Sequence, residues 1–413
     1  MAGRQRVGWV AVALVASTLA CSSDGGGGEQ DAGERAGEAT IVVTPAVALA
    51  DEPLEVTIEG LPADTDATLV VTSTDDAGRV WTDEAEVRVE ADGTVDPGAA
   101  TQATTDLLAT LRPDDDEDGL YHWSRDELTF SVEVRGADDA QASAEIERSI
   151  VDDGVQDRPT TLEDEGFVGH LWSPEAVPAE PVPGVVLIGG SEGGLGGLFE
   201  APLLASHGYP ALQLGLFELP GLPDDLRSIP LEMIADALRW LGQQPGVDPD
   251  RLWVRGGSRG SEAALLVGAH FPDLVAGVVA TVPSSAVNCA FPDCEGSAWT
   301  LAGDPLPYSS RSDEIPPEAV IPVERIDGPV ITTCGGRDSL WDSCAFARLI
   351  TARRGAAGTD DVSISRARAG HGVGLIAPQV VAGDIPAFAG GEPIADEQAR
   401  VEAWAAFLEA LDA

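Results

Sequence analysis

The chain has 413 residues and carries 70 acidic against 24 basic side chains, a formal charge of −46. Every basic residue is arginine, which excludes mechanisms that need a lysine, such as P-loops, kinase-type sites and lysine Schiff bases. A surface this acidic also argues against a nucleic-acid partner, because phosphate backbones are bound by clustered cations. The hydrophobic content of 44% is that of a globular protein with an ordinary core.

The N-terminus has the features of a secretory signal peptide, which we assign to residues 1–20. Arg4 and Arg6 precede an uncharged, mainly apolar run from Val7 to Leu19, and the small residue Ala20 follows it. The run is shorter than the roughly 20 residues that a membrane-spanning helix needs. We therefore predict export, and no helix that crosses the membrane at this point.

The end of the signal resembles a bacterial lipobox. Residues 17–21 read Ser-Thr-Leu-Ala-Cys, and in a lipobox the cysteine becomes the lipid-modified first residue. The next stretch, residues 21–38, contains four consecutive glycines and is typical of a flexible tether. We expect lipidation at Cys21 and a location on the outer face of the bacterial cytoplasmic membrane. An ordinary signal peptide that happens to contain cysteine is the alternative.

Two regions with different periodicity follow the tether. Residues 39–145 consist of short β-rich runs between turn residues, which predicts an all-β sandwich. These runs include Ala39–Val43, Leu54–Ile58, Ala67–Thr72, Ala85–Glu90 and Leu128–Val134. In residues 146–413, strand-like runs alternate with helical ones, which predicts a mostly parallel sheet with helices on both faces. Its runs include the strands Val185–Ile188, Ala211–Leu216 and Leu252–Val254 and the helix Leu231–Leu241.

Ser258 is the candidate nucleophile. It stands in the sequence Gly256-Gly-Ser-Arg-Gly260, directly after the strand-like run and before a helical one. A Gly-x-Ser-x-Gly sequence between a strand and a helix is the nucleophile elbow of α/β-hydrolases, where small residues must flank a serine held on a tight turn. A glycine-rich structural turn is the alternative.

The serine needs a base, and His371 is the candidate among only five histidines. It lies in the glycine-flanked segment Ala369–Gly374, after the strand-like Val362–Ala367. It is placed late in the chain, as the hydrolase order Ser…Asp…His requires. His207 and His270 each fall at the end of a helical run, a position typical of a structural polar residue.

Asp338 is the candidate acid. It follows an apolar run and a glycine turn, Pro329–Gly336, and a carboxylate there would fix the imidazole tautomer and stabilise the imidazolium. Asp342 is the alternative. The non-catalytic role open to either is that of a turn or helix N-cap residue.

An oxyanion hole needs two backbone donors beside the nucleophile. We expect one at the amide of Arg259, the residue after the serine. The other should come from the glycine-rich loop Gly189–Gly197, near Ser191 or Glu192, because glycine lets a backbone approach a substrate closely. This loop does not fit the register of a dinucleotide-binding fingerprint.

Four cysteines remain after Cys21, an even number that suggests disulfides in an exported chain. Three pairings are possible, and we favour Cys289–Cys294 and Cys334–Cys344 because each pair lies within one short segment. Zinc binding is the alternative, but no Cys-x-x-Cys or His-Glu-x-x-His spacing is present. We therefore predict neither a metal nor a cofactor.

Several longer motifs also occur in a fixed order along the chain. In the first region they are Asp51-Glu-Pro-Leu-Glu-Val56, Ile58-Glu-Gly-Leu-Pro62 and Gly119-Leu-Tyr-His-Trp-Ser124. In the second they are Gly189-Gly-Ser-Glu-Gly-Gly-Leu195, Leu204-Ala-Ser-His-Gly-Tyr209, Gly257-Ser-Arg-Gly260, Ser297-Ala-Trp-Thr300, Gly335-Gly-Arg-Asp-Ser-Leu-Trp-Asp-Ser343 and Gly370-His371. Together they resemble the acyl-CoA thioesterase and bile acid-CoA:amino acid N-acyltransferase family over most of the chain from residue 39.

This resemblance implies an immunoglobulin-like sandwich followed by an α/β-hydrolase domain, with Ser258, Asp338 and His371 as the catalytic triad. It implies a small-molecule acyl thioester or ester as substrate and hydrolysis as the reaction. Acyl transfer to an amine is an alternative, and a cell-surface binding protein that keeps the fold without activity is another. Transferases of this family in eukaryotes often have cysteine as nucleophile, where this chain has serine.

The net charge bears on the leaving group, because a polyanionic protein repels polyanionic CoA. Arg259 could offer CoA a local cation, or it could pair with Glu262 one helical turn further on as a surface ion pair. We also expect the segment that contains Cys289–Cys294 and Trp299 to cover the substrate. A disulfide-bridged surface loop is the alternative.

Overall fold

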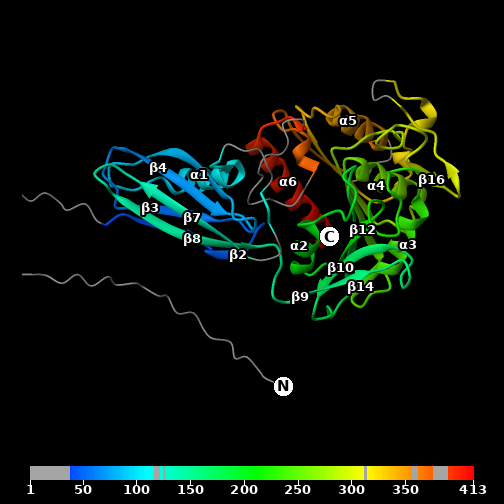
Figure 1. Ribbon diagram of the computed structural model, residues 1–413, viewed down its shortest axis with the longest axis horizontal. Coiled ribbons are helices and arrows are strands. Elements are labelled where there is room, and N and C mark those ends of the chain that lie inside the picture. Colours follow the sequence, from blue (N-terminus) through cyan, green and yellow to red (C-terminus); the bar gives the residue numbers. More distant parts are fainter. Residues whose placement is uncertain (1–37, 116–120, 124–126, 311–313, 356–360, 375–388) are drawn as a thin grey trace, which may run out of the picture. The chain divides into compact units, whose positions relative to one another are not determined.

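The computed structural model describes residues 38–115, 121–123, 127–310, 314–355, 361–374 and 389–413 (Figure 1). The predicted signal peptide, Cys21 and almost all of the tether lie outside the described residues. From Gly37 to the C-terminus the chain forms one compact unit. In the part of the chain that the structure describes, no helix has both the length and the apolar character needed to span a membrane.

The first region is built on a six-stranded sheet in the order β2-β8-β7-β4-β5-β6, with β1 and β3 forming a separate two-stranded sheet. The strands are β1 Thr40–Thr44, β2 Val47–Leu49, β3 Glu55–Glu59, β4 Asp66–Thr74, β5 Val80–Arg88, β6 Arg112–Pro113, β7 Leu128–Arg135 and β8 Gln141–Ser149. In β7, buried and more exposed residues alternate as expected for a strand with one face in a core. The last strand continues beyond the predicted domain boundary at residue 145.

One element of this region differs from the all-β prediction. Helix α1, Pro97–Thr110, contacts β3, β4 and β5 and adds Ala100, Leu107 and Leu108 to the core. Its start carries recognisable signals: the Asp96 carboxylate accepts the Ala99 N–H at 2.9 Å, and proline occupies the first helical position. This N-cap signature lies between β-rich runs, and the alternation that indicates strands does not indicate the helix.

The second region is an eight-stranded sheet in the order β19-β18-β15-β14-β11-β12-β10-β9. The strands are β9 Val155–Thr160, β10 Val168–Pro174, β11 Val182–Ile188, β12 Ala211–Gly215, β14 Val247–Gly257, β15 Gly277–Thr281, β18 Val330–Gly335 and β19 Val362–Arg366. All neighbours pair in parallel except around β10, which is antiparallel to both β9 and β12. The short strands β13 Ile229–Pro230, β16 Trp299–Leu301 and β17 Asp304–Pro305 form a small separate sheet.

Helices cover both faces of the large sheet, and successive residues of β11 show why. Val185 and Leu187 belong to the cluster of buried side chains that includes α2, Glu200–Ser206, and α6, Pro393–Asp412. Val186 and Ile188 belong to the cluster on the other face. That face holds the helices α3 Leu231–Leu241, α4 Arg259–His270 and α5 Ser343–Arg354. The predicted α/β-hydrolase fold is confirmed, with a parallel sheet buried on both sides.

This topology gathers the candidate site at one edge of the sheet. The glycine loop follows β11, Ser258 follows β14, Asp338 follows β18 and His371 follows β19. Carboxyl ends of parallel strands lie at a common edge, where open α/β sheets bind their ligands. Residues far apart in sequence can therefore meet there.

Candidate active site

Ser258 lies at the turn between β14 and α4. Its backbone has a φ of 52° and a ψ of −121°, a conformation that non-glycine residues rarely adopt. The Ser258 N–H donates to the Thr281 carbonyl at 3.0 Å, which fixes the turn to the end of β15. The strained backbone presents the hydroxyl beyond the sheet edge, at the N-terminus of α4.

The two glycines of the elbow are required by close backbone contacts. A Cβ atom at Gly256 would lie 2.0 Å from the Gly260 carbonyl oxygen. A Cβ atom at Gly260 would lie 2.3 Å from the carbonyl oxygen of Gly189, at the start of the glycine loop. No side chain fits at either distance, so only glycine allows the first turn of α4 to pack against that loop.

The three predicted triad residues form a continuous hydrogen-bonded chain. His371 Nε2 lies 3.0 Å from Ser258 Oγ, and His371 Nδ1 lies 3.0 and 2.9 Å from the two carboxylate oxygens of Asp338. The Asp338 side chain is fully buried and that of His371 is 12% exposed. The indole of Trp341 packs edge-on against the imidazole, with the ring centres 5.3 Å apart. This is the geometry by which a histidine removes a serine proton while an aspartate orients it.

The structure separates the two candidate acids. Asp338 Oδ1 also accepts the backbone N–H groups of Leu340 and Trp341, at 3.0 and 3.3 Å, so the turn itself aims the carboxylate. Asp342 instead caps α5, because its carboxylate accepts the Ala345 N–H at 2.8 Å. Asp342 therefore has a structural role, and only Asp338 contacts the imidazole.

Two buried side chains donate hydrogen bonds to the backbone of the loop that carries His371. Arg255 Nη2 and Thr281 Oγ1 each donate to the Gly374 carbonyl oxygen at 2.6 Å. Arg255 also forms an ion pair with Glu200 at the start of α2, and both side chains are almost fully buried. One guanidinium thus joins the nucleophile strand, the base loop and the helix after the glycine loop.

The glycine loop lies directly against the nucleophile. A Cβ atom at Gly190 would lie 3.0 Å from Ser258 Cβ, so the backbone of this residue closely approaches the serine. The Gly190 N–H donates to Glu192 Oε1 at 2.7 Å, and the Glu192 side chain is exposed. Arg259 begins α4, so its amide has no partner within the helix. The assignment of the oxyanion to the amides of Arg259 and of Ser191 or Glu192 stays a prediction.

A small pocket opens beside this loop. It is lined by the glycines Gly189, Gly190, Gly193 and Gly194 and by the apolar side chains Leu214, Leu216 and Phe217. The glycines supply backbone and the β12 end supplies an apolar wall.

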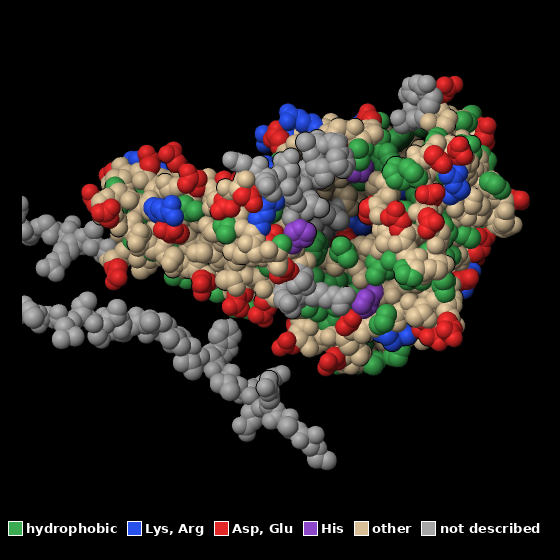
Figure 2. Space-filling model, in the orientation of Figure 1, with side chains coloured by type: hydrophobic (Ala, Val, Ile, Leu, Met, Phe, Trp, Pro, Cys, Tyr) green, Lys and Arg blue, Asp and Glu red, His purple; other side chains and the backbone are tan. Residues whose placement is uncertain are grey.

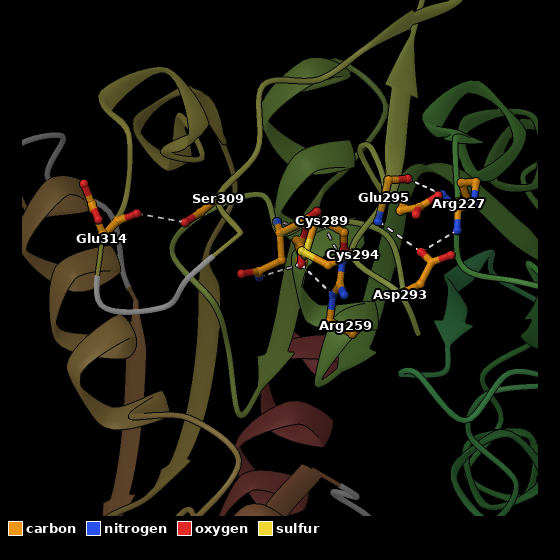
Figure 3. The surroundings of a disulfide bond; sticks show 10 residues. Arg227, Arg259, Cys289, Asp293, Cys294, Glu295, Ser309 and Glu314 are labelled. Carbon is orange, nitrogen blue, oxygen red and sulfur yellow. Dashed lines mark hydrogen bonds and ion pairs between the residues drawn. A yellow bond between two sulfur atoms is a disulfide. The ribbon is translucent and has the colours of Figure 1, made fainter.

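The side chain of Arg259 is directed away from solvent. It pairs with Glu262 at 3.0 Å as the sequence allowed, but the predicted surface location is wrong, because the two side chains are only 8% and 0% exposed. The guanidinium also donates to the Cys289 carbonyl oxygen at 2.9 Å, next to the Cys289–Cys294 disulfide (Figure 3). A cation committed in this way is not available to a polyanionic substrate.

Glu262 is the centre of this buried cluster. Its Oε1 accepts the Asn288 N–H and the Trp299 Nε1–H, both at 2.7 Å, and its Oε2 accepts from Asn288 Nδ2 and Arg259 Nε, both at 3.0 Å. Trp299 is 1% exposed and belongs to the core, while a covering role for its segment stays a prediction. The disulfide-bridged segment is thereby fastened to the first turn of α4.

The second disulfide joins Cys334, in β18, to Cys344, in the first turn of α5. Both local pairs that the sequence favoured are therefore bonded in the structure. The remaining candidate histidines have other partners or places: His207 Nε2 is 2.5 Å from an Asp51 oxygen, and His270 ends α4. Among the residues that the structure describes, no cluster of His, Cys, Asp or Glu could hold a metal ion.

Comparison with known families agrees with this geometry. The acyl-CoA thioester hydrolase/BAAT N-terminal region matches residues 51–161, and the BAAT/acyl-CoA thioester hydrolase C-terminal region matches residues 308–412. The chain belongs to the acyl-CoA thioester hydrolase/BAAT family.

Individual relatives include both activities of this family. Acyl-coenzyme A thioesterase 6 of Mus musculus is 27% identical over 89% of this chain and 94% of its own length. Acyl-coenzyme A amino acid N-acyltransferase 1 of Mus musculus is 26% identical over 75% of this chain and 80% of its own length. Among solved structures, a putative dienelactone hydrolase from Klebsiella pneumoniae has 18% identity and a TM-score of 0.43 over 62% of this chain and 98% of its own.

The structure brings together the three residues that the sequence motifs indicate, Ser258, Asp338 and His371, but the residues that support them are not part of those motifs. Arg255 carries a signal in the sequence, since it is a charge directly after the apolar run Leu252–Val254 and three residues before Ser258. Thr281 and Asn288 carry no such signal in the sequence, because a single polar residue does not indicate which distant carbonyl or carboxylate it will hydrogen bond. These contacts depend on the tertiary fold.

The buried Glu262 cluster generates a stability prediction. Glu262→Gln replaces an acceptor oxygen by an NH₂ group that faces hydrogen-bond donors and leaves Arg259 without its ion-pair partner. We expect a loss of about 2–4 kcal/mol in the free energy of unfolding, measured by urea denaturation. The control Glu318→Gln, at an exposed position, should change it by less than about 0.5 kcal/mol. Equal effects of the two variants would contradict the assigned role.

Proposed function

We propose that this protein is a serine hydrolase of acyl thioesters and esters. The proposal is carried by one observation, the hydrogen-bonded chain from Ser258 through His371 to the buried Asp338. Membership of a family whose matched regions are described as acyl-CoA thioester hydrolase supports the class of substrate. No metal or other cofactor takes part in the proposed mechanism.

Ser258 Oγ attacks the acyl carbonyl carbon while its proton passes to His371 Nε2. The buried Asp338 carboxylate stabilises the imidazolium that forms and keeps its Nδ1–H aligned. The tetrahedral oxyanion would be bound by the Arg259 amide and an amide of the glycine loop, often the largest single contribution to catalysis. The imidazolium then protonates the departing thiolate or alkoxide. Water attacks the acyl-serine with His371 as base, and the proton returns to Ser258 as the acid leaves.

Acyl transfer to an amine is the second candidate, because relatives named N-acyltransferases match most of this chain. It would use the same acyl-serine and differ only in the nucleophile that attacks it. Product analysis with and without added amino acids separates the two reactions. Amide formation would favour transfer, whereas free acid as the sole product favours hydrolysis.

The proposed triad predicts the effect of three substitutions on turnover. Ser258→Ala should reduce kcat on p-nitrophenyl acetate by at least ~10⁴-fold and abolish labelling by a fluorophosphonate probe. Asp338→Asn should reduce kcat by roughly 10²–10⁴-fold, because the imidazole loses the carboxylate that holds its tautomer. The matched control Asp342→Asn keeps a good helix cap and should leave kcat nearly unchanged. Labelling that persists in Ser258→Ala would disprove the proposed nucleophile.

The charges around the site bear on which leaving groups the protein accepts. Acidic side chains are spread over the face of the molecule in Figure 2 and greatly outnumber basic ones. At the site, Arg259 and Arg255 are buried against carboxylates, while Glu192 is exposed on the glycine loop. We therefore propose that esters with uncharged leaving groups are better substrates than acyl-CoA.

Added salt should accordingly raise kcat/KM for acetyl-CoA but leave that for p-nitrophenyl acetate nearly unchanged, because only the first interaction is repulsive. Glu192→Gln should raise kcat/KM for acetyl-CoA about two- to fivefold at low salt. Glu409→Gln, at the exposed far end of α6, serves as the control and should have no such effect. A salt-independent preference for acetyl-CoA would overturn the proposal.

We further propose that the protein is exported and anchored by a lipid at Cys21. The signal-like residues 1–20 and the two disulfides support an oxidising, extracytoplasmic location. In a bacterial host, the wild type should then fractionate with membranes. Cys21→Ser should prevent lipidation and remove the protein from the detergent-extracted lipoprotein fraction. Identical fractionation without lipid incorporation in either protein would disprove the anchor.

A further inference from the structure

The loop that bears His371 is contacted on both sides of the histidine by one helix. Asp396 Oδ1, in the first turn of α6, accepts the Gly370 N–H at 2.6 Å. Arg400 Nη1, one turn further along the same helix, donates to the Gly372 carbonyl oxygen at 3.0 Å. The two partners are the residues immediately before and after His371.

Both side chains are well placed to fix this loop. Asp396 is 2% exposed and Arg400 is fully buried, so neither bond competes with bulk water. Glu397 neutralises Arg400, with contacts of 2.8 and 2.6 Å to the guanidinium. Below them, the apolar side chains of Ala369 and Val373 pack in one cluster with Ala395 and Ala399 of α6. Apolar contacts and hydrogen bonds therefore both hold the His371 loop against α6.

We propose that Asp396 and Arg400 are positioning residues for the catalytic base. By hydrogen bonding to the Gly370 N–H and the Gly372 carbonyl oxygen, they set the backbone orientation of His371. That orientation in turn aligns the two ring nitrogens of His371 with Asp338 and Ser258. This inference rests on the proposed function, in which His371 transfers the serine proton. Neither residue touches the reacting atoms, so both act through the histidine.

The protonation state of Asp396 bears on its contact with the loop. Its pKa is raised to about 6, mainly by burial and also by Asp338 and Glu397, against the lowering effects of the Gly370 N–H and Arg400. Above that pH the ionised carboxylate makes a charge-assisted hydrogen bond to the Gly370 N–H. An asparagine at this position would keep an acceptor for that N–H but carry no charge.

The test compares Asp396→Asn, which keeps an acceptor oxygen but no charge, with Asp396→Ala, which keeps neither. The full chain is labelled at histidine Cε1, and the NMR signal of His371 is recorded without substrate. With five histidines in the chain, its signal can be assigned by replacing each in turn. Asp396→Asn should leave this signal near its wild-type position, whereas Asp396→Ala should move or broaden it, because only the second variant leaves the Gly370 N–H without its acceptor.

Turnover of p-nitrophenyl acetate gives the second readout. Asp396→Asn should keep kcat within about threefold, because asparagine still accepts the Gly370 N–H. Asp396→Ala should lower kcat at least ~10-fold with little change in KM, because a displaced base is costly. Glu409→Gln on the same helix is the control and should leave both readouts unchanged.

Arg400 is tested by the double change Arg400→Met with Glu397→Gln, so that no buried charge remains without a partner. This variant should lower kcat like Asp396→Ala while the NMR spectrum shows a folded protein. If kcat survives Asp396→Ala, the positioning role is wrong. If the His371 signal moves in Asp396→Ala but the wild type neither turns over esters nor reacts with a fluorophosphonate, the proposed function fails, while the contact by which Asp396 orders the His371 loop is kept.

Discussion

Close packing between two glycine backbones is the constraint on which this active site depends. Gly260, in the first turn of α4, lies so near the Gly189 carbonyl that a Cβ atom would be 2.3 Å from its oxygen. This contact brings the loop after β11 against the turn that holds Ser258. The strained φ of 52° at Ser258 lies within this close packing, and strained backbone persists only where its surroundings determine it. The Ser258 turn and the glycine loop are therefore held against each other by backbone contacts.

Around that fixed pair, three buried arginines repeat one arrangement. Arg255, Arg259 and Arg400 each form an ion pair with a glutamate and donate to the backbone carbonyl of a loop. A guanidinium can do both at once because its donors diverge in a fixed plane, whereas a lysine ammonium is a single point of charge. In a chain without lysine, cations are used here as internal connectors between helices and loops.

Much of the fold could be predicted because its signals are local. The helix Leu231–Leu241 and the turn at Ser258 follow from periodicity and from glycine spacing, and the order Ser…Asp…His selects His371. Helix α1 was missed because an N-cap and a proline mark only its start, amid β-rich sequence. The burial of Arg259 and Glu262 could not be predicted, because it depends on Asn288 and Trp299 arriving from a distant segment. The choice between Asp338 and Asp342 likewise needed the cap geometry of α5.

The two disulfides close rings around segments that support the candidate site. Asp338 lies inside the ring closed by Cys334 and Cys344, and Arg259 donates to the carbonyl of Cys289 in the other ring. Reduction would open both rings while leaving Ser258, Asp338 and His371 unchanged. The loop that bears Asp338 and the segment that anchors the start of α4 would then each lose a covalent closure. The arrangement around Ser258 therefore depends on bonds that lie outside these three residues.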